Sequence, residues 1–289
     1  METLISHDQT PIRYVSLGHG RPLIFLHGWT ASVREWLPFA APLSEQFRTL
    51  CWDARGHGDH RYNSDIDMGI GAMAADLHQL ITELKLDKPV LIGHSMGALT
   101  SWEYIRHYGS DHLGGLCIID QSPKLITDSN WQHGIYSDFD SNSNQHLIGR
   151  LGEDFAEGVL ELAANGNNPR ITENYQRNSR GFQKLRLTLQ QLPADLLIRA
   201  WKSLSTQDYR DVLSQINIPC LQIYGDQSQF YSQDLAHWVA CQLNNTQLQF
   251  YPNSDHSPHL WHQQQFIYDL NQFCQQLEHL DPRSQAPVT

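Results

Sequence analysis

Residues 91–99 read LIGHSMGAL and hold one serine with a glycine two positions away on each side. The apolar residues before Gly93 predict a strand and those after Gly97 predict a helix, so Ser95 falls at a sharp strand-to-helix turn. Side chains at the two glycine positions would collide in such a turn. The turn would expose the Ser95 hydroxyl at a helix N-terminus, where the dipole favours negative charge. The pattern therefore predicts a nucleophilic serine.

The segment FYPNSDHSPHLWHQQQF, residues 250–266, supplies the histidines that could activate this serine. A serine hydroxyl needs a general base to attack at neutral pH. His256 follows an expected strand by a short polar loop, which places its ring at the same rim of the sheet as the serine. His259 is expected to pack at the start of a helix, and His262 falls inside that helix. We therefore predict that His256 is the base.

Three carboxylates compete to orient this histidine. Asp120 ends the apolar stretch 113–120, and the carboxyl ends of neighbouring parallel strands are where catalytic groups gather. Asp226 follows a later strand, but it could instead brace its own turn through an Asx-type hydrogen bond. Asp255 is adjacent to His256, and sequence neighbours seldom orient each other's rings well. Asp120 is the preferred acid and Asp226 is the alternative.

The stretch LHGW, residues 26–29, ends an earlier expected strand and can complete an oxyanion hole. Such a hole takes the backbone N–H after the nucleophile, which belongs to Met96, and a second N–H from an earlier loop, which we assign to Trp29. Aromatic residues that could form the walls of a substrate pocket are Trp29, Trp131, Tyr136 and Phe139. For the last three, ordinary packing against the core is the competing interpretation.

Short apolar stretches alternate with longer helical ones along most of the chain. Expected strands are 12–18, 22–28, 47–54, 89–95, 113–120, 219–226 and 246–253. Expected helices lie near 33–45, 71–86, 97–108, 231–243 and 262–278. Nearly continuous apolar strands are typical of a parallel sheet that is buried on both faces, and the alternation predicts a doubly wound α/β fold.

The alternation stops between Pro123 and Ile218, where no convincing strand appears. This stretch is too long for an ordinary connection and contains several helical patterns. We predict a core formed by residues 1–122 and 208–280, with residues 123–207 inserted as a helical cap. Residues 281–289 are expected to form a frayed tail.

Composition narrows the function classes. The chain has 289 residues and a formal net charge of −11, so it is expected to bind neither nucleic acid nor an anionic membrane. Its five cysteines are scattered and its histidines show no zinc-like spacing, so no metal is expected. No nucleotide-binding glycine motif follows a strand, so no cofactor is expected. No apolar run reaches about 18 residues and the N-terminus lacks signal-peptide features, which predicts a cytoplasmic protein.

Four motifs together resemble the α/β-hydrolase superfamily. They are FLHGW (25–29), DARGHG (53–58), GHSMG (93–97) and DHSPH (255–259), in this order. The resemblance implies an α/β-hydrolase fold with an eight-stranded, mostly parallel sheet flanked by helices, and a Ser–acid–His triad. Because the nucleophile position holds serine, the resemblance disfavours dehalogenase and epoxide-hydrolase chemistry, which uses aspartate there.

Two further segments, DQSPK (120–124) and YGDQSQFY (224–231), look like the non-heme chloroperoxidase or carboxylesterase branch. Most superfamily members carry the triad acid three residues after the glycine that corresponds to Gly225, where this chain has Ser228. Some members instead place the acid after the strand that ends here at Asp120. The resemblance therefore agrees with an acid that has moved to the neighbouring strand.

These features predict a serine hydrolase that cleaves a small to medium carboxylic ester through an acyl-enzyme. A lactonase would use the same residues on a ring substrate, because the difference would lie in the shape of the cap. A carbon–carbon bond hydrolase and a ligand receptor built on the same fold are the less favoured alternatives. The expected partner is a small-molecule ester or lactone, and the sequence predicts no oligomeric state.

Overall fold

The computed structural model describes residues 1–60 and 62–280, so the expected tail at 281–289 lies outside the described residues. Its centre is an eight-stranded sheet with the order β1-β2-β4-β3-β5-β6-β7-β8. The strands are β1 (Glu2–Ile5), β2 (Pro11–Leu17), β3 (Pro22–Leu26), β4 (Arg48–Asp53), β5 (Val90–His94), β6 (Gly115–Ile119), β7 (Cys220–Gly225) and β8 (Thr246–Tyr251). Only the pairings of β1 with β2 and of β2 with β4 are antiparallel. The predicted eight-stranded, mostly parallel sheet is confirmed.

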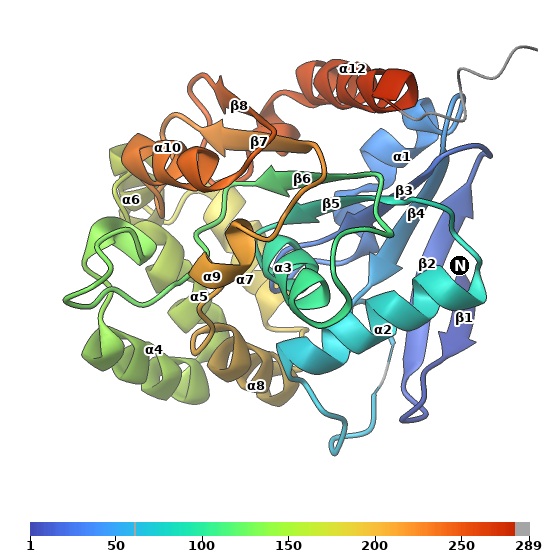
Figure 1. Cartoon of the computed structure of the whole chain (residues 1–289). Coiled ribbons are helices and arrows are strands. Elements are labelled where there is room, and N and C mark those ends of the chain that lie inside the picture. Colours follow the sequence, from blue (N-terminus) through green and yellow to red (C-terminus); the bar gives the residue numbers. More distant parts are fainter. Residues whose placement is uncertain (61, 281–289) are drawn as a thin grey trace, which may run out of the picture.

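Two layers of helices cover the sheet (Figure 1). One face packs against α1 (Leu37–Leu43) and α12 (Gln263–Leu280), and the other packs against α2 (Ile70–Glu83), α3 (Met96–Tyr108) and α10 (Gln233–Gln242). Successive residues of β5 alternate between these layers. Ile92 packs with the layer of α1 and α12, and Leu91 packs with the layer of α2, α3 and α10. This alternation explains why the central strands read as continuous apolar runs, because both of their faces are buried.

Between β6 and β7 the chain forms an insertion that consists of helical elements and isolated bridges. They are η2 (Ile135–Ser137), α4 (Ser141–Glu153), α5 (Phe155–Ala164), α6 (Pro169–Gln176), α7 (Arg180–Leu189), α8 (Ala194–Leu204) and α9 (Arg210–Leu213). Side chains of Asp140, Asp154 and Asn168 cap α4, α5 and α6 by accepting hydrogen bonds from backbone N–H groups of the first turn. No helix among the described residues combines the length and the apolar character needed to cross a membrane.

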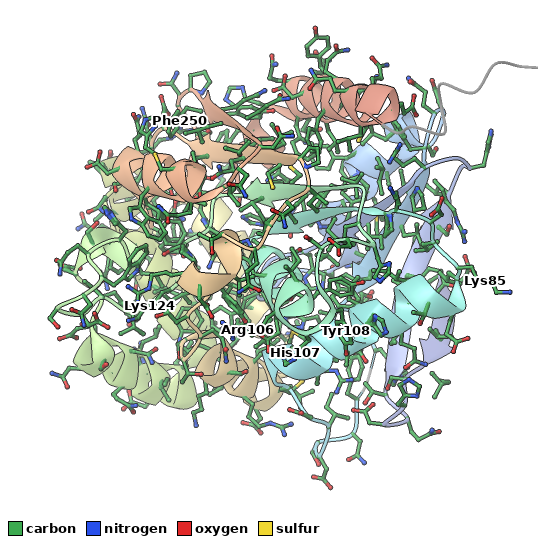
Figure 2. All side chains as sticks on the ribbon, in the orientation of Figure 1. Lys85, Arg106, His107, Tyr108, Lys124 and Phe250 are labelled. Atoms are coloured by element: carbon green, nitrogen blue, oxygen red, sulfur yellow. The ribbon has the colours of Figure 1, made fainter. Side chains whose placement is uncertain are left out.

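The two ends of this insertion lie side by side. An isolated antiparallel bridge pairs Lys124, which follows β6, with Asp208, which precedes α9 and β7. Arg106 of α3 donates to the Asp208 carbonyl, and its guanidinium lies 4.4 Å from the centre of the Tyr209 ring. Arg106 and Lys124 are both labelled in Figure 2. The chain thus enters and leaves the insertion at two adjacent positions.

Candidate active site

Ser95 occupies the turn between β5 and α3 with φ +52° and ψ −115°, a conformation that is costly for a residue with a side chain. A Cβ at Gly93 would lie 2.5 Å from the Gly97 carbonyl carbon, and one at Gly97 would lie 2.1 Å from the Leu26 carbonyl oxygen. Both glycines are therefore required by close backbone approach, for the reason expected from the sequence. The turn leaves Ser95 half-buried at the N-terminus of α3.

His256 and Asp120 come together although 136 positions separate them in the sequence. Nδ1 of His256 lies 2.9 Å from Oδ1 of Asp120, and Asp120 is fully buried just after β6. The loop that carries His256 passes very close to the end of β7, because a Cβ at Gly225 would lie 2.1 Å from the Asp255 carbonyl oxygen. Glycine at this position therefore allows the loop to reach Asp120.

Ser228 supports the Asp120 carboxylate. The Ser228 hydroxyl donates to Oδ1 of Asp120 at 2.8 Å, and the Gly225 N–H donates to Oδ2 at 2.9 Å. Together with His256, these groups give the buried carboxylate three donors. These contacts fix the orientation of the carboxylate toward the His256 ring. Sequence reasoning considered Ser228 only as the residue found where most relatives have an acid, and the structure adds this hydrogen bond.

The protonation of His256 follows from its surroundings. Burial lowers its pKa below the ordinary value of 6.5 and outweighs the opposing effect of Asp120, while the nearby His94 lowers the pKa further. Since the Asp120 carboxylate can only accept, the neutral imidazole donates through Nδ1–H. Nε2 then keeps its lone pair, which is the state that a general base needs.

The other candidate carboxylates make different contacts. Asp226 is exposed, and its backbone N–H donates to the Tyr251 carbonyl at 3.1 Å. Oδ1 of Asp255 accepts from the Ser257 N–H at 2.9 Å. Within residues 1–60 and 62–280, neither side chain forms a hydrogen bond with the His256 ring. Of the three predicted acids, only Asp120 contacts the ring.

The competing histidines also have other partners. Nε2 of His262 donates to the Pro252 carbonyl at 2.7 Å, at the solvent-exposed end of that loop. His259 is fully buried in α11 (Pro258–Trp261), where its ring stacks on Trp36 with centroids 4.7 Å apart. It packs at the start of a helix, as the sequence indicates.

The backbone N–H groups of Trp29 and Met96 donate to no other group in the described part of the chain. Met96 is the first residue of α3, where N–H groups have no partner within the helix. The Trp29 side chain is fixed by α8, because its Nε1–H donates to the Leu197 carbonyl at 2.9 Å and its ring packs against Trp201. Both donors are therefore available to a ligand that carries negative charge.

A cavity of about 1350 Å³ lies between the sheet and the insertion, and it is lined by both Ser95 and His256. Apolar residues that the insertion contributes to its walls include Leu125, Ile135, Val159, Leu162, Leu187, Leu192, Leu196, Trp201 and Leu204. Residues of the core that also line it include Trp29, Met96, Leu99 and Phe230. The walls are therefore mainly apolar, with polar groups concentrated around the serine.

Of the four predicted wall aromatics, only Trp29 is among the described residues that line this cavity. Trp131 packs against Trp238 with its Nε1–H donating to the Lys124 carbonyl at 2.9 Å. Tyr136 donates its hydroxyl to the Leu162 carbonyl and packs against Phe139, which is buried. These three residues are wrong as wall candidates, because packing within the insertion and against the core uses their side chains.

Sequence reasoning missed a second cluster beside the site. Glu35 of η1 (Val33–Glu35) lies with His94 and His259, and one ligand-type atom from each falls within 4.8 Å of the others. Among the described residues, these three form the group whose side chains could together bind a metal ion. However, Oε1 of Glu35 lies 2.7 Å from Nδ1 of His94, closer than the roughly 3.3 Å that a tetrahedral zinc imposes between its ligands. The cluster fits a hydrogen-bonded network better than a metal site.

A mostly parallel sheet with a serine at the strand-to-helix turn after β5 defines the class of α/β hydrolases. A model of the alpha/beta hydrolase fold matches residues 21–263, and the chain belongs to this family. Within the family it falls in the branch that resembles non-heme chloroperoxidases and esterases. The protein is therefore a hydrolase of the alpha/beta fold.

Individual relatives agree with this placement. The chain is 27% identical over 262 residues to a non-heme chloroperoxidase of Kitasatospora aureofaciens, which covers 89% of this chain and 92% of the relative. It is 23% identical over 272 residues to a pimeloyl-[acyl-carrier protein] methyl ester esterase of Aliivibrio salmonicida, covering 92% and 97%. The solved structure of an esterase from Exiguobacterium antarcticum superposes with a TM-score of 0.79 at 21% identity, covering 94% and 98%, which supports the fold.

Proposed function

We propose that the protein hydrolyses a small to medium, uncharged carboxylic ester through an acyl-enzyme on Ser95. The observation that carries the proposal is the 2.9 Å contact between Nδ1 of His256 and Oδ1 of Asp120, in a site that shares its cavity with Ser95. A neutral histidine oriented by a buried carboxylate, beside a serine on a strained turn, is the arrangement that acyl transfer requires.

In the proposed mechanism, Oγ of Ser95 attacks the carbonyl carbon while Nε2 of His256 takes the hydroxyl proton. The negative charge on the carbonyl oxygen is stabilised by the N–H groups of Met96 and Trp29. His256 then returns the proton to the departing alcohol, and the ester oxygen leaves. Water, activated by His256, attacks the acyl-enzyme and releases the acid, which regenerates the Ser95 hydroxyl.

The substrate class follows from the cavity. Its walls are mainly apolar, and residues 123–207 supply many of them, so we assign this segment the role of a cap over the acyl group. The core would then comprise residues 1–122 and 208–280, with the joints near the Lys124–Asp208 bridge. The names of the relatives, an esterase and a chloroperoxidase, suit ester hydrolysis and a side reaction in which peroxide replaces water to give a peracid.

Turnover of p-nitrophenyl acetate and butyrate tests the proposal, with acyl lactones measured in parallel. Ser95→Ala should lower kcat by at least on the order of 10⁴-fold, because no other group can form the acyl-enzyme. Ser257→Ala is the matched control, since Ser257 lines the same cavity without a proposed role. A Ser95→Ala variant that turns over like the wild type would exclude the mechanism. If acyl lactones are turned over faster than the p-nitrophenyl esters, the substrate is a lactone instead of an open-chain ester.

A further inference from the structure

Glu35 is a buried carboxylate that the proposed mechanism does not use. Its side chain is 6% exposed, and its oxygens accept from three different segments. Oε2 accepts from the Gly28 N–H at 3.1 Å, while Oε1 accepts from Nδ1 of His94 at 2.7 Å and from Nε2 of His259 at 2.9 Å. Such a buried anion needs strong partners to be stable, so these contacts are tightly constrained.

Each of these contacts leads to a group of the proposed site. Gly28 precedes Trp29, whose N–H is a proposed oxyanion donor, and His94 precedes Ser95. Nε2 of His94 also donates to the His256 carbonyl at 2.8 Å, so the same network holds the backbone of the proposed base. One carboxylate therefore connects the three segments that must converge for the reaction.

The geometry also fixes the charge of His94. Its Nδ1 faces the Glu35 carboxylate and its Nε2 faces the His256 carbonyl, and both of these partners can only accept. Both ring nitrogens must therefore carry a proton, which makes His94 an imidazolium. In agreement, Glu35 raises the pKa of His94 against the effect of burial. The two histidines hold the pKa of Glu35 well below its usual range, although burial acts in the opposite direction.

We propose that the buried ion pair between Glu35 and His94 is a positioning device for the reaction on Ser95. It fixes the oxyanion donor of Trp29 and the backbone of His256, and it touches no reacting atom itself. The inference rests on the proposed function. It predicts a loss of transition-state stabilisation, with little loss of substrate binding, when the carboxylate loses its charge.

The ion pair also acts on the proposed base through its field. Titratable groups that face the His256 ring from the surrounding elements are Asp120, His94, Tyr231, Asp255 and His259. Among them, the His94 cation lowers the pKa of His256, and Asp120 and Asp255 raise it. Without its counter-ion, the buried His94 would lose its proton, and the pKa of His256 would rise.

The test compares the wild type with Glu35→Gln in two assays. The first measures kcat and KM for p-nitrophenyl butyrate across pH. The second measures the rate at which a fluorophosphonate labels Ser95, in which the Oγ–P bond forms, fluoride leaves and the proton passes to His256. We expect Glu35→Gln to lower kcat and the labelling rate by about 10- to 100-fold with KM changed less than about threefold. The acid limb of both profiles should move to higher pH by roughly half a unit or more.

Three further variants separate positioning from general destabilisation. Asp269→Asn removes another buried carboxylate, which accepts from Tyr251 and Gln265 outside the cavity lining, and should leave kcat and the acid limb unchanged. Glu35→Asp keeps the charge and should retain the wild-type acid limb even if kcat falls. Should Glu35→Gln fail to fold, His94→Gln removes the cation and should move the acid limb in the same direction.

Three other results would each contradict the positioning role of Glu35. Wild-type rates and an unmoved acid limb in Glu35→Gln would overturn the positioning role and leave the function of Ser95 intact. A lower kcat with an unmoved acid limb would also overturn it, because general destabilisation would explain such a loss. If the wild type neither cleaves esters nor reacts with the fluorophosphonate, the proposed function fails, and the inference fails with it.

Discussion

Two carboxylate–histidine pairs lie next to each other at the carboxyl end of the sheet, and they differ in charge. Asp120 contacts His256 at 2.9 Å and Glu35 contacts His94 at 2.7 Å, with the rings of the two histidines 4.8 Å apart. The pKa of His256 is lowered, whereas the pKa of His94 is raised. Two histidines, each paired with a buried carboxylate in the same region, are thus held in opposite protonation states.

The difference does not come from the number of donors on the carboxylates. Asp120 and Glu35 each accept one backbone N–H and two side-chain donors. It comes from the second ring nitrogen of the histidine. In His94 that nitrogen faces a carbonyl and must be protonated, whereas in His256 it can remain a base for the cavity that the ring lines. The environment of one nitrogen therefore separates a structural cation from a proposed base.

The largest expected effect comes from Asp120→Asn. An asparagine amide can donate to Nδ1 of His256, which would place the proton on Nε2 and remove the lone pair that the base needs. We expect kcat to fall about 10⁴-fold, close to 5.5 kcal/mol, while the far-UV circular dichroism spectrum stays that of a folded protein.

Asp226→Asn is the matched control, because Asp226 follows the adjacent strand and is exposed. It should retain wild-type kcat in the same p-nitrophenyl butyrate assay. If Asp226→Asn loses activity and Asp120→Asn keeps it, the assignment of the acid to Asp120 is wrong, and so is the comparison of the two pairs.

The sequence predicted the sheet well because burial on both faces makes the parallel strands nearly continuous apolar runs. Each of the seven strands from β2 to β8 overlaps an expected stretch, such as 113–120 for β6. β1 was missed, because Glu2–Ile5 is only four residues long, lies at the edge of the sheet and is largely exposed. A strand of this kind has no apolar pattern that would distinguish it from a loop.

The candidate site could be predicted only where residue type and local motif coincide. Ser95 lies in a glycine pattern, and Asp120 ends an apolar strand, so both are visible in the sequence. Glu35 lies 59 positions from His94 in the expected helix near 33–45, and no local signal connects the two residues. The role of Ser228 depends on the distance between the ends of two neighbouring strands, which folding alone determines.

The pH dependence of stability gives a second, smaller difference around the Glu35 pair. Burial lowers the pKa of His259 to about 4, so the unfolded chain binds this proton first as the pH falls below about 6.5. Stability should fall by about 2 kcal/mol between pH 7.5 and 5 from this residue alone. His94 contributes in the opposite direction, because its raised pKa stabilises the fold fully below about 6.5 and less as the pH rises through its folded value.

Urea unfolding of the wild type and of His259→Gln at several pH values checks this prediction. The glutamine amide can still donate to Glu35 but does not titrate, so the fall in stability below pH 6.5 should shrink by about 2 kcal/mol. His262→Gln is the control for the same substitution at a partly exposed histidine. Equal slopes for the wild type and His259→Gln would contradict the protonation state assigned to His259.

The smallest effect should come from Ser228→Ala, which removes one donor from Asp120 and none from Glu35. Since a hydrogen bond to a charged group contributes about 1.5 kcal/mol, we expect kcat to fall roughly tenfold as the carboxylate loses part of its orientation. Ser254→Ala is the control for losing a buried serine hydroxyl, because Ser254 is buried and donates to the Tyr251 carbonyl at 2.7 Å. Ser228 differs from it in also accepting from the Phe230 and Tyr231 N–H groups at 3.3 Å. Equal losses of kcat in the two variants would mean that Ser228 acts only through packing. A loss of kcat confined to Ser228→Ala would mean that the Ser228 hydroxyl orients the Asp120 carboxylate. In that case the position that holds the acid in most relatives supports the acid in this chain.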